Sequence, residues 1–256
     1  MAPMRLKDKV FMITLIVVSF TIISSTTDDP PASLSSEAIN YWEQFTWDKY
    51  SCLNDSTLSF EAFQEALQGY YLLKKNNQLT NQEYLSIIDF SKHSSENRFF
   101  LIDMTTFSVV HKTYCSHGKA TGTGFASSFS NVEGSKQSSL GFYITGETYL
   151  GKFDLGLRLD GLERSNSRAR SRGVVMHGAH YATASFLNRN NNVLGRSYGC
   201  PAVPKEEADL LIHKIKNGSL MYIYHPDKSY HRMSKILNNF QFLSNNVNKW
   251  DELDTI

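Results

Sequence analysis

An apolar run that ends in histidine and glycine, residues 174–178, is followed by a segment, residues 195–202, in which glycines surround a cysteine. The apolar run is typical of a buried strand, and the glycine-rich segment is typical of a tight turn. A strand end holds an imidazole rigidly, and a turn beside it can bring a sulfur within reach. The pattern therefore predicts a fold in which one strand and one turn place His177 beside Cys200.

A histidine next to a cysteine in this setting is typical of a thiol acyltransferase. His177 would take the proton of the Cys200 thiol, and the thiolate would attack a carbonyl carbon. Gly199 allows close backbone approach, so its N–H group and that of Cys200, with Tyr198, would line the site of the developing oxyanion.

These residues resemble the L,D-transpeptidases of bacterial cell walls, whose signature is His-Gly, a spacer and Ser/Thr-His-Gly-Cys. Residues 177–178 match the first half and residues 197–200 the second. Tyr198 stands at the place of the second histidine, and Ala202 at the place of a small polar or basic residue. The chain is thus similar to a divergent branch that reads Arg-Ser-aromatic-Gly-Cys-Pro-Ala, and the resemblance extends over roughly residues 58–225.

The resemblance implies an α+β fold: a mostly β catalytic core, an L,D-transpeptidase-like β-sandwich, with flanking helices and a small N-terminal helical segment. It implies peptidoglycan stem peptides as partners, and a thioester between Cys200 and the third stem residue that is passed to an amine acceptor or to water. The carbonyl of Gly178 would orient His177. No cofactor and no metal are implied, and carbapenems are expected to acylate Cys200.

Further residues are candidates for substrate contact. Arg196 is the nearest cation to the cysteine in sequence and could bind a peptide carboxylate. Ser197 would hydrogen-bond within the turn or to the substrate. Ser139 and Tyr143 are candidates from the resemblance alone. A basic loop before the histidine strand is either a solvated loop or a cover that attracts acidic stem peptides; its arginines are Arg164, Arg168, Arg170 and Arg172.

Other functions stay open at this point. Residues 195–199 match Gly-x-Ser-x-Gly, the serine-hydrolase turn, but that turn needs a strand directly before it and a helix directly after it. The alternatives are therefore a peptide hydrolase or L,D-carboxypeptidase, or a catalytically degenerate cell-wall-binding module. A zinc site at His177 and His180 lacks both the helical spacing and the acidic residue of zinc proteases.

The N-terminus has the composition of an export signal. Basic residues precede an apolar run at 10–23, and small polar residues follow. We expect a signal peptide or an N-terminal membrane anchor, and a location in the periplasm or cell envelope. Lys and Arg total 26 and Asp and Glu total 25, so the charge gives no case for nucleic acid as a partner.

Hydrophobic spacing predicts the order of elements along the chain. Helical spacing predicts helices at 34–50, 59–74 and 204–218. Short runs rich in β-branched and aromatic residues predict strands at 87–90, 99–104, 107–112, 141–145, 155–159, 173–176 and 220–224. The expected segments are a signal peptide at 1–25, a linker at 26–33, a helical segment at 34–80, the catalytic domain at 81–226 and a polar tail at 227–256.

The chain has three cysteines, an odd number for an exported protein, so at least one lacks an intramolecular partner. Cys52 and Cys115 could pair or could both stay unpaired. Cys200 is the natural free thiol, which in an oxidising compartment suggests a function.

Overall fold

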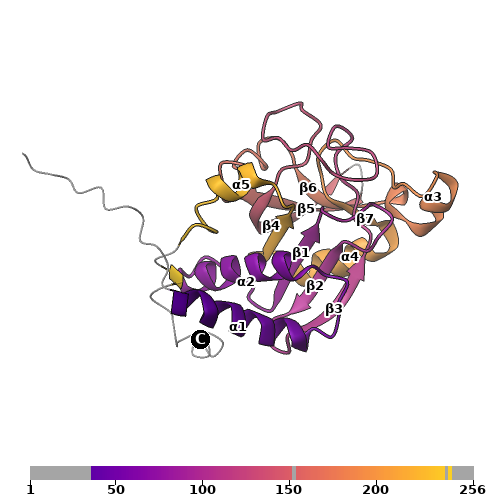
Figure 1. The fold of residues 1–256 in the computed structure, drawn as a ribbon. Helices are drawn as coiled ribbons and strands as arrows, with labels where there is room; N and C mark the ends of the chain where they lie inside the picture. Colours follow the sequence, from indigo (N-terminus) through magenta and orange to yellow (C-terminus); the bar gives the residue numbers. More distant parts are fainter. Residues whose placement is uncertain (1–35, 152–153, 240–241, 244–256) are drawn as a thin grey trace, which may run out of the picture. The chain divides into compact units, whose positions relative to one another are not determined.

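A computed structural model describes residues 36–151, 154–239 and 242–243 (Figure 1). These described residues all belong to one compact unit by their contacts. The helices are α1 (Ser36–Cys52), α2 (Phe60–Lys75), α3 (Ala184–Arg189), α4 (Lys205–Ile215) and α5 (Lys228–Met233), with a 3₁₀ turn at His180–Ala182. The strands are β1 (Tyr84–Asp89), β2 (Phe99–Asp103), β3 (Ser108–Thr113), β4 (Gly141–Gly151), β5 (Asp154–Gly161), β6 (Val175–Ala179), β7 (Ala202–Pro204) and β8 (Leu220–Tyr224).

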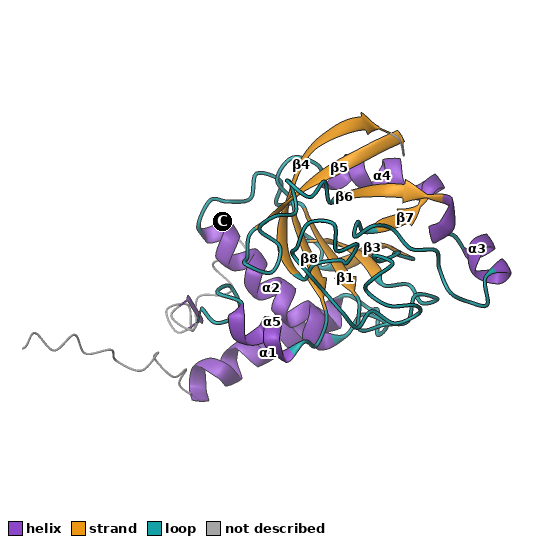
Figure 2. Ribbon diagram, turned by 90° about the horizontal axis from the view of Figure 1, so that it is seen from above, coloured by secondary structure: helices purple, strands orange, loops and turns teal. Residues whose placement is uncertain are grey.

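All eight strands belong to one mixed sheet, in the order β3-β2-β1-β8-β4-β5-β6-β7. The pairs β1–β8 and β6–β7 are parallel and the others are antiparallel. The helices α1 and α2 lie against one face of the sheet and α4 lies against the other (Figures 1 and 2). Because both faces of the central strands are covered, every residue of β1 and β8 is buried.

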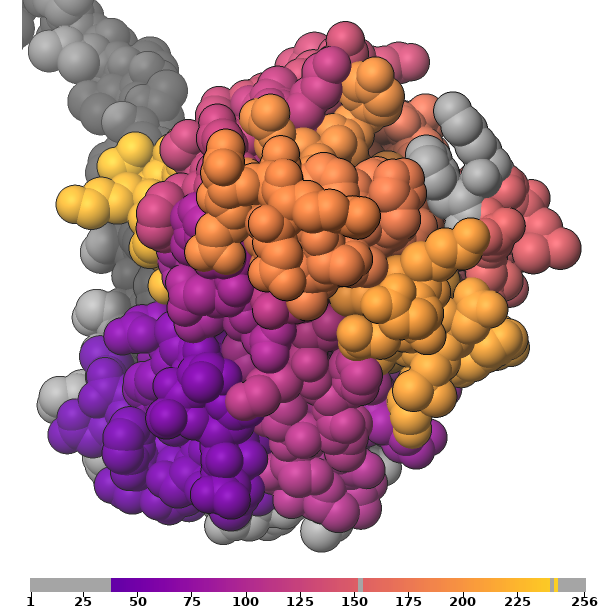
Figure 3. All heavy atoms as spheres, turned by 90° about the vertical axis from the view of Figure 1, so that its right-hand side faces the viewer, coloured from indigo at the N-terminus to yellow at the C-terminus, as the bar shows by residue number. Residues whose placement is uncertain are grey.

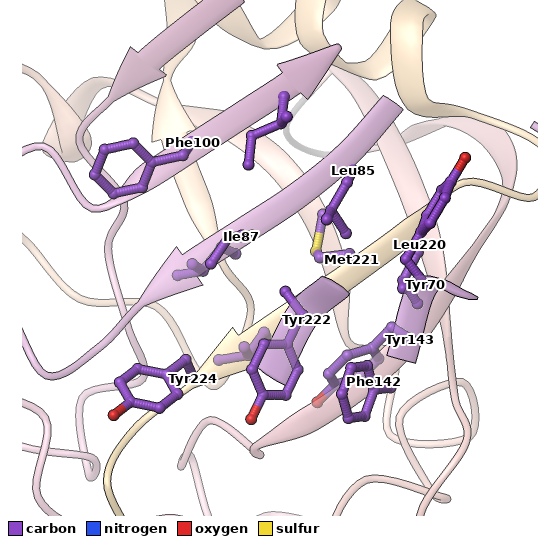
Figure 4. Packing of buried hydrophobic residues seen from close by; sticks show 14 of the residues in the cluster. Tyr70, Leu85, Ile87, Phe100, Phe142, Tyr143, Leu220, Met221, Tyr222 and Tyr224 are labelled. Carbon is purple, nitrogen blue, oxygen red and sulfur yellow. The ribbon is translucent and has the colours of Figure 1, made fainter. Parts of the chain in front are cut away.

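The core is rich in aromatic side chains. Figure 4 shows Phe142 and Tyr222 side by side from neighbouring strands, and their ring centroids lie 4.2 Å apart in a stacked arrangement. The helix α2 approaches this stack closely at Gly69, where a Cβ atom would lie 2.1 Å from the ring of Phe142. The buried face of α2, which includes Phe63, Tyr70 and Tyr71, is therefore a packing face against the sheet.

The helix α4 supports the strand that carries His177. Its apolar face buries Ala208, Leu211, Ile212 and Ile215, which matches the periodicity of the sequence. At Gly178 the helix comes so close that a Cβ atom would lie 2.8 Å from the Cβ of Ala208. A glycine at this position lets β6 pack directly on α4, and this contact fixes the position of the end of β6 relative to α4.

The α+β class with a mostly β core is confirmed, and the strands run through one continuous sheet. The three predicted helices and seven predicted strands are all present; most ends differ by up to three residues, but β4 runs to Gly151, six residues beyond its predicted end. The sequence did not indicate α3, β7 or α5, and the last of these lies in the segment expected to be a polar tail. The predicted signal peptide and linker lie outside the described residues, among which no helix is long and apolar enough to cross a membrane.

Candidate active site at the β6–β7 edge

His177 lies in the middle of β6, at the edge of the sheet where the short strand β7 is added. The register of the parallel pair sets His177 opposite Ala202, and the amide of His177 donates to the carbonyl of Pro201 at 3.4 Å. The other edge of β7 is covered by an antiparallel bridge between Ser116 and Ala202. Thus β7, which directly follows Cys200, is held on both sides.

The imidazole of His177 has a defined orientation. Its Nδ1 atom lies 3.0 Å from the carbonyl oxygen of Gly178. Since a carbonyl oxygen only accepts hydrogen bonds, Nδ1 carries the proton and Nε2 carries the lone pair. The side chain is 2% exposed, and this burial lowers the pKa of His177 below its ordinary value of 6.5. The resting imidazole is therefore a neutral base.

Cys200 presents a half-buried free thiol beside the same strand. Its Sγ atom accepts from the amide of Val175 at 3.5 Å, two residues before His177 on β6. The sulfur also lies 3.7 Å from the carbonyl oxygen of Gly173. Burial raises the pKa of the Cys200 thiol, while the Val175 amide and the nearby charge of Arg172 act in the opposite direction. The thiol thus needs a base to become a nucleophile.

The turn before Cys200 is closed by Ser197. Its hydroxyl donates to the carbonyl of Cys200 at 2.6 Å and accepts from the amide of Gly199 at 3.0 Å. Gly199 has a φ of +132°, in the region that favours glycine. Because the Gly199 amide is bound within the turn, its predicted part in an oxyanion site is not available in this conformation. The Cys200 amide remains a candidate for that role.

Ser197 itself is a poor candidate for a nucleophile. It is 6% exposed, and both hydrogen bonds of its hydroxyl lie within the turn. The nearest following helix, α4, begins only at Lys205. The strand–nucleophile–helix arrangement of serine hydrolases is therefore absent from this segment.

Residues His117, Lys119 and Ser138 form hydrogen bonds with the backbone of the turn. The amide of Ser197 donates to the carbonyl of His117 at 3.0 Å, and the amide of Lys119 donates to the carbonyl of Ser197 at 2.8 Å. The hydroxyl of Ser138 donates to the carbonyl of Gly199 at 3.0 Å. The position of Cys200 therefore depends on residues far away in the sequence, which the motif does not indicate.

A buried arginine that the sequence did not indicate contacts His117, one of the residues bonded to the turn. Arg98 is fully buried, donates to the carbonyl of Cys115 at 2.6 Å and lies 2.8 Å from Nδ1 of His117. Burial and the charge of Arg98 lower the pKa of His117 to about 3. His117 therefore stays neutral and accepts from Arg98, which fixes the segment that holds the turn. A lone arginine in the sequence gives no signal of burial.

The basic residues near the cysteine separate into different roles. Arg172 is half-buried and donates to the carbonyls of Ser130 at 2.8 Å and Gln137 at 2.7 Å. Arg170 forms ion pairs with Glu147 and Asp160 on the neighbouring hairpin. Arg170 and Arg172 are thus held by different partners, and a cover over the site by the four loop arginines stays a prediction.

Two candidate substrate contacts are occupied by other groups. Arg196 donates from its exposed guanidinium to the carbonyls of Lys119 and Gly122, at 3.3 and 3.0 Å. Ser139 is 2% exposed, and its hydroxyl lies 2.7 Å from that of Tyr143. These residues shape the loops around the cysteine, and their contact with a substrate stays a prediction.

The described residues contain no group of three or more His, Cys, Asp and Glu side chains that could hold a metal ion. All three cysteines are free: Cys52 is exposed on α1, and Cys115 is buried. Burial raises the pKa of Cys115 to about 12, so this thiol is inert at neutral pH.

Figure 3 views the molecule from the side of α3. The segment that contains α3, in orange, forms the middle of this face, and α4, in gold, lies beside it. The segment around α3 is thus exposed on this face, whereas every residue of β6 is buried. A half-buried thiol and an oriented base at a sheet edge define a site suited to acyl transfer.

Comparison with known proteins identifies the family of the chain. A sequence model described as the L,D-transpeptidase catalytic domain matches residues 54–224, so the chain belongs to the L,D-transpeptidase catalytic domain family. No curated protein matches the chain.

Solved structures similar to this chain are L,D-transpeptidases. One from Mycobacterium smegmatis is 14% identical, with a TM-score of 0.36, over 56% of this chain and 59% of that one. One from Mycobacterium tuberculosis H37Rv is 15% identical, with a TM-score of 0.37, over 56% and 58%. L,D-transpeptidase 3 from Mycobacterium tuberculosis with a faropenem-derived adduct is 14% identical, with a TM-score of 0.37, over 56% and 60%. The chain thus spans less than two thirds of the length of each.

Proposed function

We propose that the protein is a peptidoglycan L,D-transpeptidase that uses Cys200 as its nucleophile. The observation that carries the proposal is a half-buried free thiol just before β7 together with a neutral, oriented imidazole on the paired strand β6, in a chain of this family. The substrate would be a stem peptide whose third residue is joined through its L-centre to a terminal D-alanine. No metal and no cofactor takes part in the proposed reaction.

In the first step, Nε2 of His177 takes the proton of the Cys200 thiol, and the sulfur attacks the carbonyl carbon of the third residue. The tetrahedral intermediate carries a negative oxygen, for which the Cys200 amide is the candidate donor. When the intermediate collapses, the bond to the D-alanine nitrogen breaks and that nitrogen takes the proton from His177. A thioester to Cys200 remains.

In the second step, an acceptor amine attacks the thioester carbonyl and gives a proton to His177. The carbon–sulfur bond breaks, and the thiolate of Cys200 recovers the proton. The acceptor would be the side chain of another stem, a D-amino acid or a protein lysine. With water as the acceptor, the same chemistry is that of an L,D-carboxypeptidase.

Intact-mass spectrometry tests this proposal. The reduced protein is mixed with a tetrapeptide muropeptide, beside the Cys200→Ala variant. We expect a transient adduct that lacks the terminal residue, present with Cys200 and absent without it. A carbapenem should add its whole mass at Cys200.

Turnover that survives Cys200→Ala and is lost in Ser197→Ala would contradict the assignment and favour a serine hydrolase. Binding of muropeptides with no adduct and no turnover in the folded protein would also contradict it and favour a cell-wall-binding module.

A further inference from the structure

Two lysines lie over the ring of an exposed tyrosine next to the candidate nucleophile. Tyr198, two residues before Cys200, is 69% exposed. The ammonium group of Lys119 lies 4.9 Å from the centroid of its ring, and that of Lys136 lies 5.4 Å away. Both lysines are exposed, and neither has an ion-pair partner among the described residues. We call Lys119, Lys136 and Tyr198 the lysine clamp.

The lysine clamp is assembled by direct backbone contacts. A Cβ atom on Gly118 would lie 2.5 Å from the carbonyl oxygen of Lys136 and 3.0 Å from the Cα of Gly199. Three separate segments therefore meet at Gly118, where a side chain would not fit. The carbonyl of Lys136 also accepts from the amide of Ala120 at 3.1 Å. Both lysines are thus fixed to the same framework that holds the cysteine turn.

Lys136 adopts a backbone conformation that a lysine rarely takes. Its φ is +57°, in the left-handed region, where glycine or asparagine would be less strained. A strained residue at a site can indicate that its side chain has a function there. Here the side chain supplies the second positive charge over Tyr198.

Two like charges near one ring, without an acidic partner, make a binding site for an anion. An anion beside the two ammonium groups offsets their repulsion and accepts charge-assisted hydrogen bonds from them. The half-buried guanidinium of Arg172, on the other side of Gly199, adds to the positive potential. The ring of Tyr198 offers an apolar surface to the carbon atoms beside the anion.

We infer that the lysine clamp binds a carboxylate of the donor peptide and so selects peptides that carry one close to the scissile bond. The inference rests on the proposed function, which places the scissile carbonyl at Cys200. Two carboxylates of the donor peptide lie within one residue of the scissile bond. One is the terminal carboxylate of the leaving D-alanine, and the other belongs to the side chain of a diamino acid at the third position.

A binding experiment that needs no turnover tests the inference. Isothermal titration calorimetry on Cys200→Ala uses a tetrapeptide with both carboxylates, the same peptide as a terminal amide, and the same peptide with the side-chain carboxylate as an amide. We expect one of the two amides to bind about tenfold or more weakly than the parent, which identifies the carboxylate bound. The preference should shrink as salt is raised.

Lys119→Met and Lys136→Met, added to Cys200→Ala, should abolish the preference for the carboxylate. The parent peptide should then bind as weakly as the amide that lacks that carboxylate. A matched control, Lys75→Met with Lys235→Met, removes the same charge from exposed positions outside the lysine clamp and should keep the preference. Lys136→Gly relieves the left-handed backbone, so it should melt no lower than the parent protein yet lose part of the preference. This variant therefore distinguishes the loss of the lysine charge from a loss of stability.

Equal binding of all three peptides, no binding of the parent peptide, or a preference that survives the double substitution would each overturn the inference. Thioester formation by the protein with Cys200 intact is measured separately. It can fail while the carboxylate preference holds, and it can succeed while the preference is absent, so the two proposals are distinguished.

Discussion

At the scale of single residues, the site combines two groups whose burial shifts their protonation in opposite directions. Burial raises the pKa of the Cys200 thiol above its ordinary value of 9.0 and lowers that of His177 below 6.5. Near neutral pH both groups are therefore uncharged. For the proposed reaction, this predicts general-base catalysis, in which the thiol proton moves only when a substrate is attacked, rather than a preformed ion pair.

This arrangement predicts the pH dependence of the site. Because His177 stays neutral until the pH falls through its lowered pKa, the acylation rate should drop only below about pH 6.5. Alkylation of free Cys200 by iodoacetamide should be slow at pH 7 and should rise through and above pH 9, as the thiolate forms. Site-resolved mass spectrometry in a Cys52→Ser background measures both, with buried Cys115 as the unreactive control.

His177→Gln should remove the acid limb together with most of the rate. Fast alkylation at pH 6, or an acid limb above pH 7, would instead indicate a resting thiolate paired with an imidazolium.

The sequence predicted the pair His177 and Cys200, together with the closure of the turn by Ser197. Local motifs report such residues because spacing along the chain reflects a strand end and a turn. Arg98 and the lysine clamp were not predicted, since they act through segments brought together only by the sheet. The sequence pointed to Arg196 as the cation near the cysteine, and the structure adds Lys119 and Lys136, which lie over the ring of Tyr198 in the same turn.

At the scale of elements, the strands that the sequence reported are those with strong apolar patterns of their own. The strand β8 was predicted with its observed ends because Leu220–Tyr224 is an uninterrupted apolar run. The strand β7 was missed because its three residues form a strand only by pairing with β6 and with Ser116. Pairing of this kind depends on residues distant in sequence, which a local pattern does not contain.

The contact between α2 and the sheet predicts the effect of Gly69→Ala. Alanine favours a helix over glycine by up to about 1 kcal/mol. The added Cβ would, however, lie 2.1 Å from the ring of Phe142, which is fully buried and stacked on Tyr222. Overpacking of this kind costs about 1–3 kcal/mol, so we expect a net loss in the free energy of unfolding.

Urea denaturation measures that loss. A second substitution, Phe142→Leu, removes the ring from the clash, so Gly69→Ala should cost less in that background than in the native one. An equal cost in both backgrounds would place the effect elsewhere than in this contact.

At the scale of the whole molecule, the family match begins at residue 54, after α1 has ended. The helix nevertheless contributes Trp42 and Phe45 to the main hydrophobic core. Phe45 is 7% exposed, and its ring centroid lies 5.8 Å from that of Tyr71 on α2. The N-terminal helical segment and the catalytic sheet therefore share one core and should unfold together.

Phe45→Ala and Trp47→Ala test this coupling with two aromatic residues from the same helix. Phe45→Ala should destabilise the protein by about 3–4 kcal/mol, because it leaves a cavity in the core. Trp47 is 51% exposed, so its substitution should cost only about 1 kcal/mol. Thiol labelling of buried Cys115, read by mass spectrometry in a Cys52→Ser background, reports opening of the sheet beside the cysteine turn.

If α1 and the sheet form one cooperative unit, Phe45→Ala speeds the labelling of Cys115 in step with its loss of stability, while Trp47→Ala leaves labelling nearly unchanged. Loss of helical circular dichroism at an unchanged labelling rate would mean that α1 folds apart from the catalytic sheet. The distinction bears on function, because Cys115 accepts a hydrogen bond from Arg98, the residue that fixes the segment behind the Cys200 turn. A packing defect at α1 would then also alter the position of Cys200, because the same core supports both.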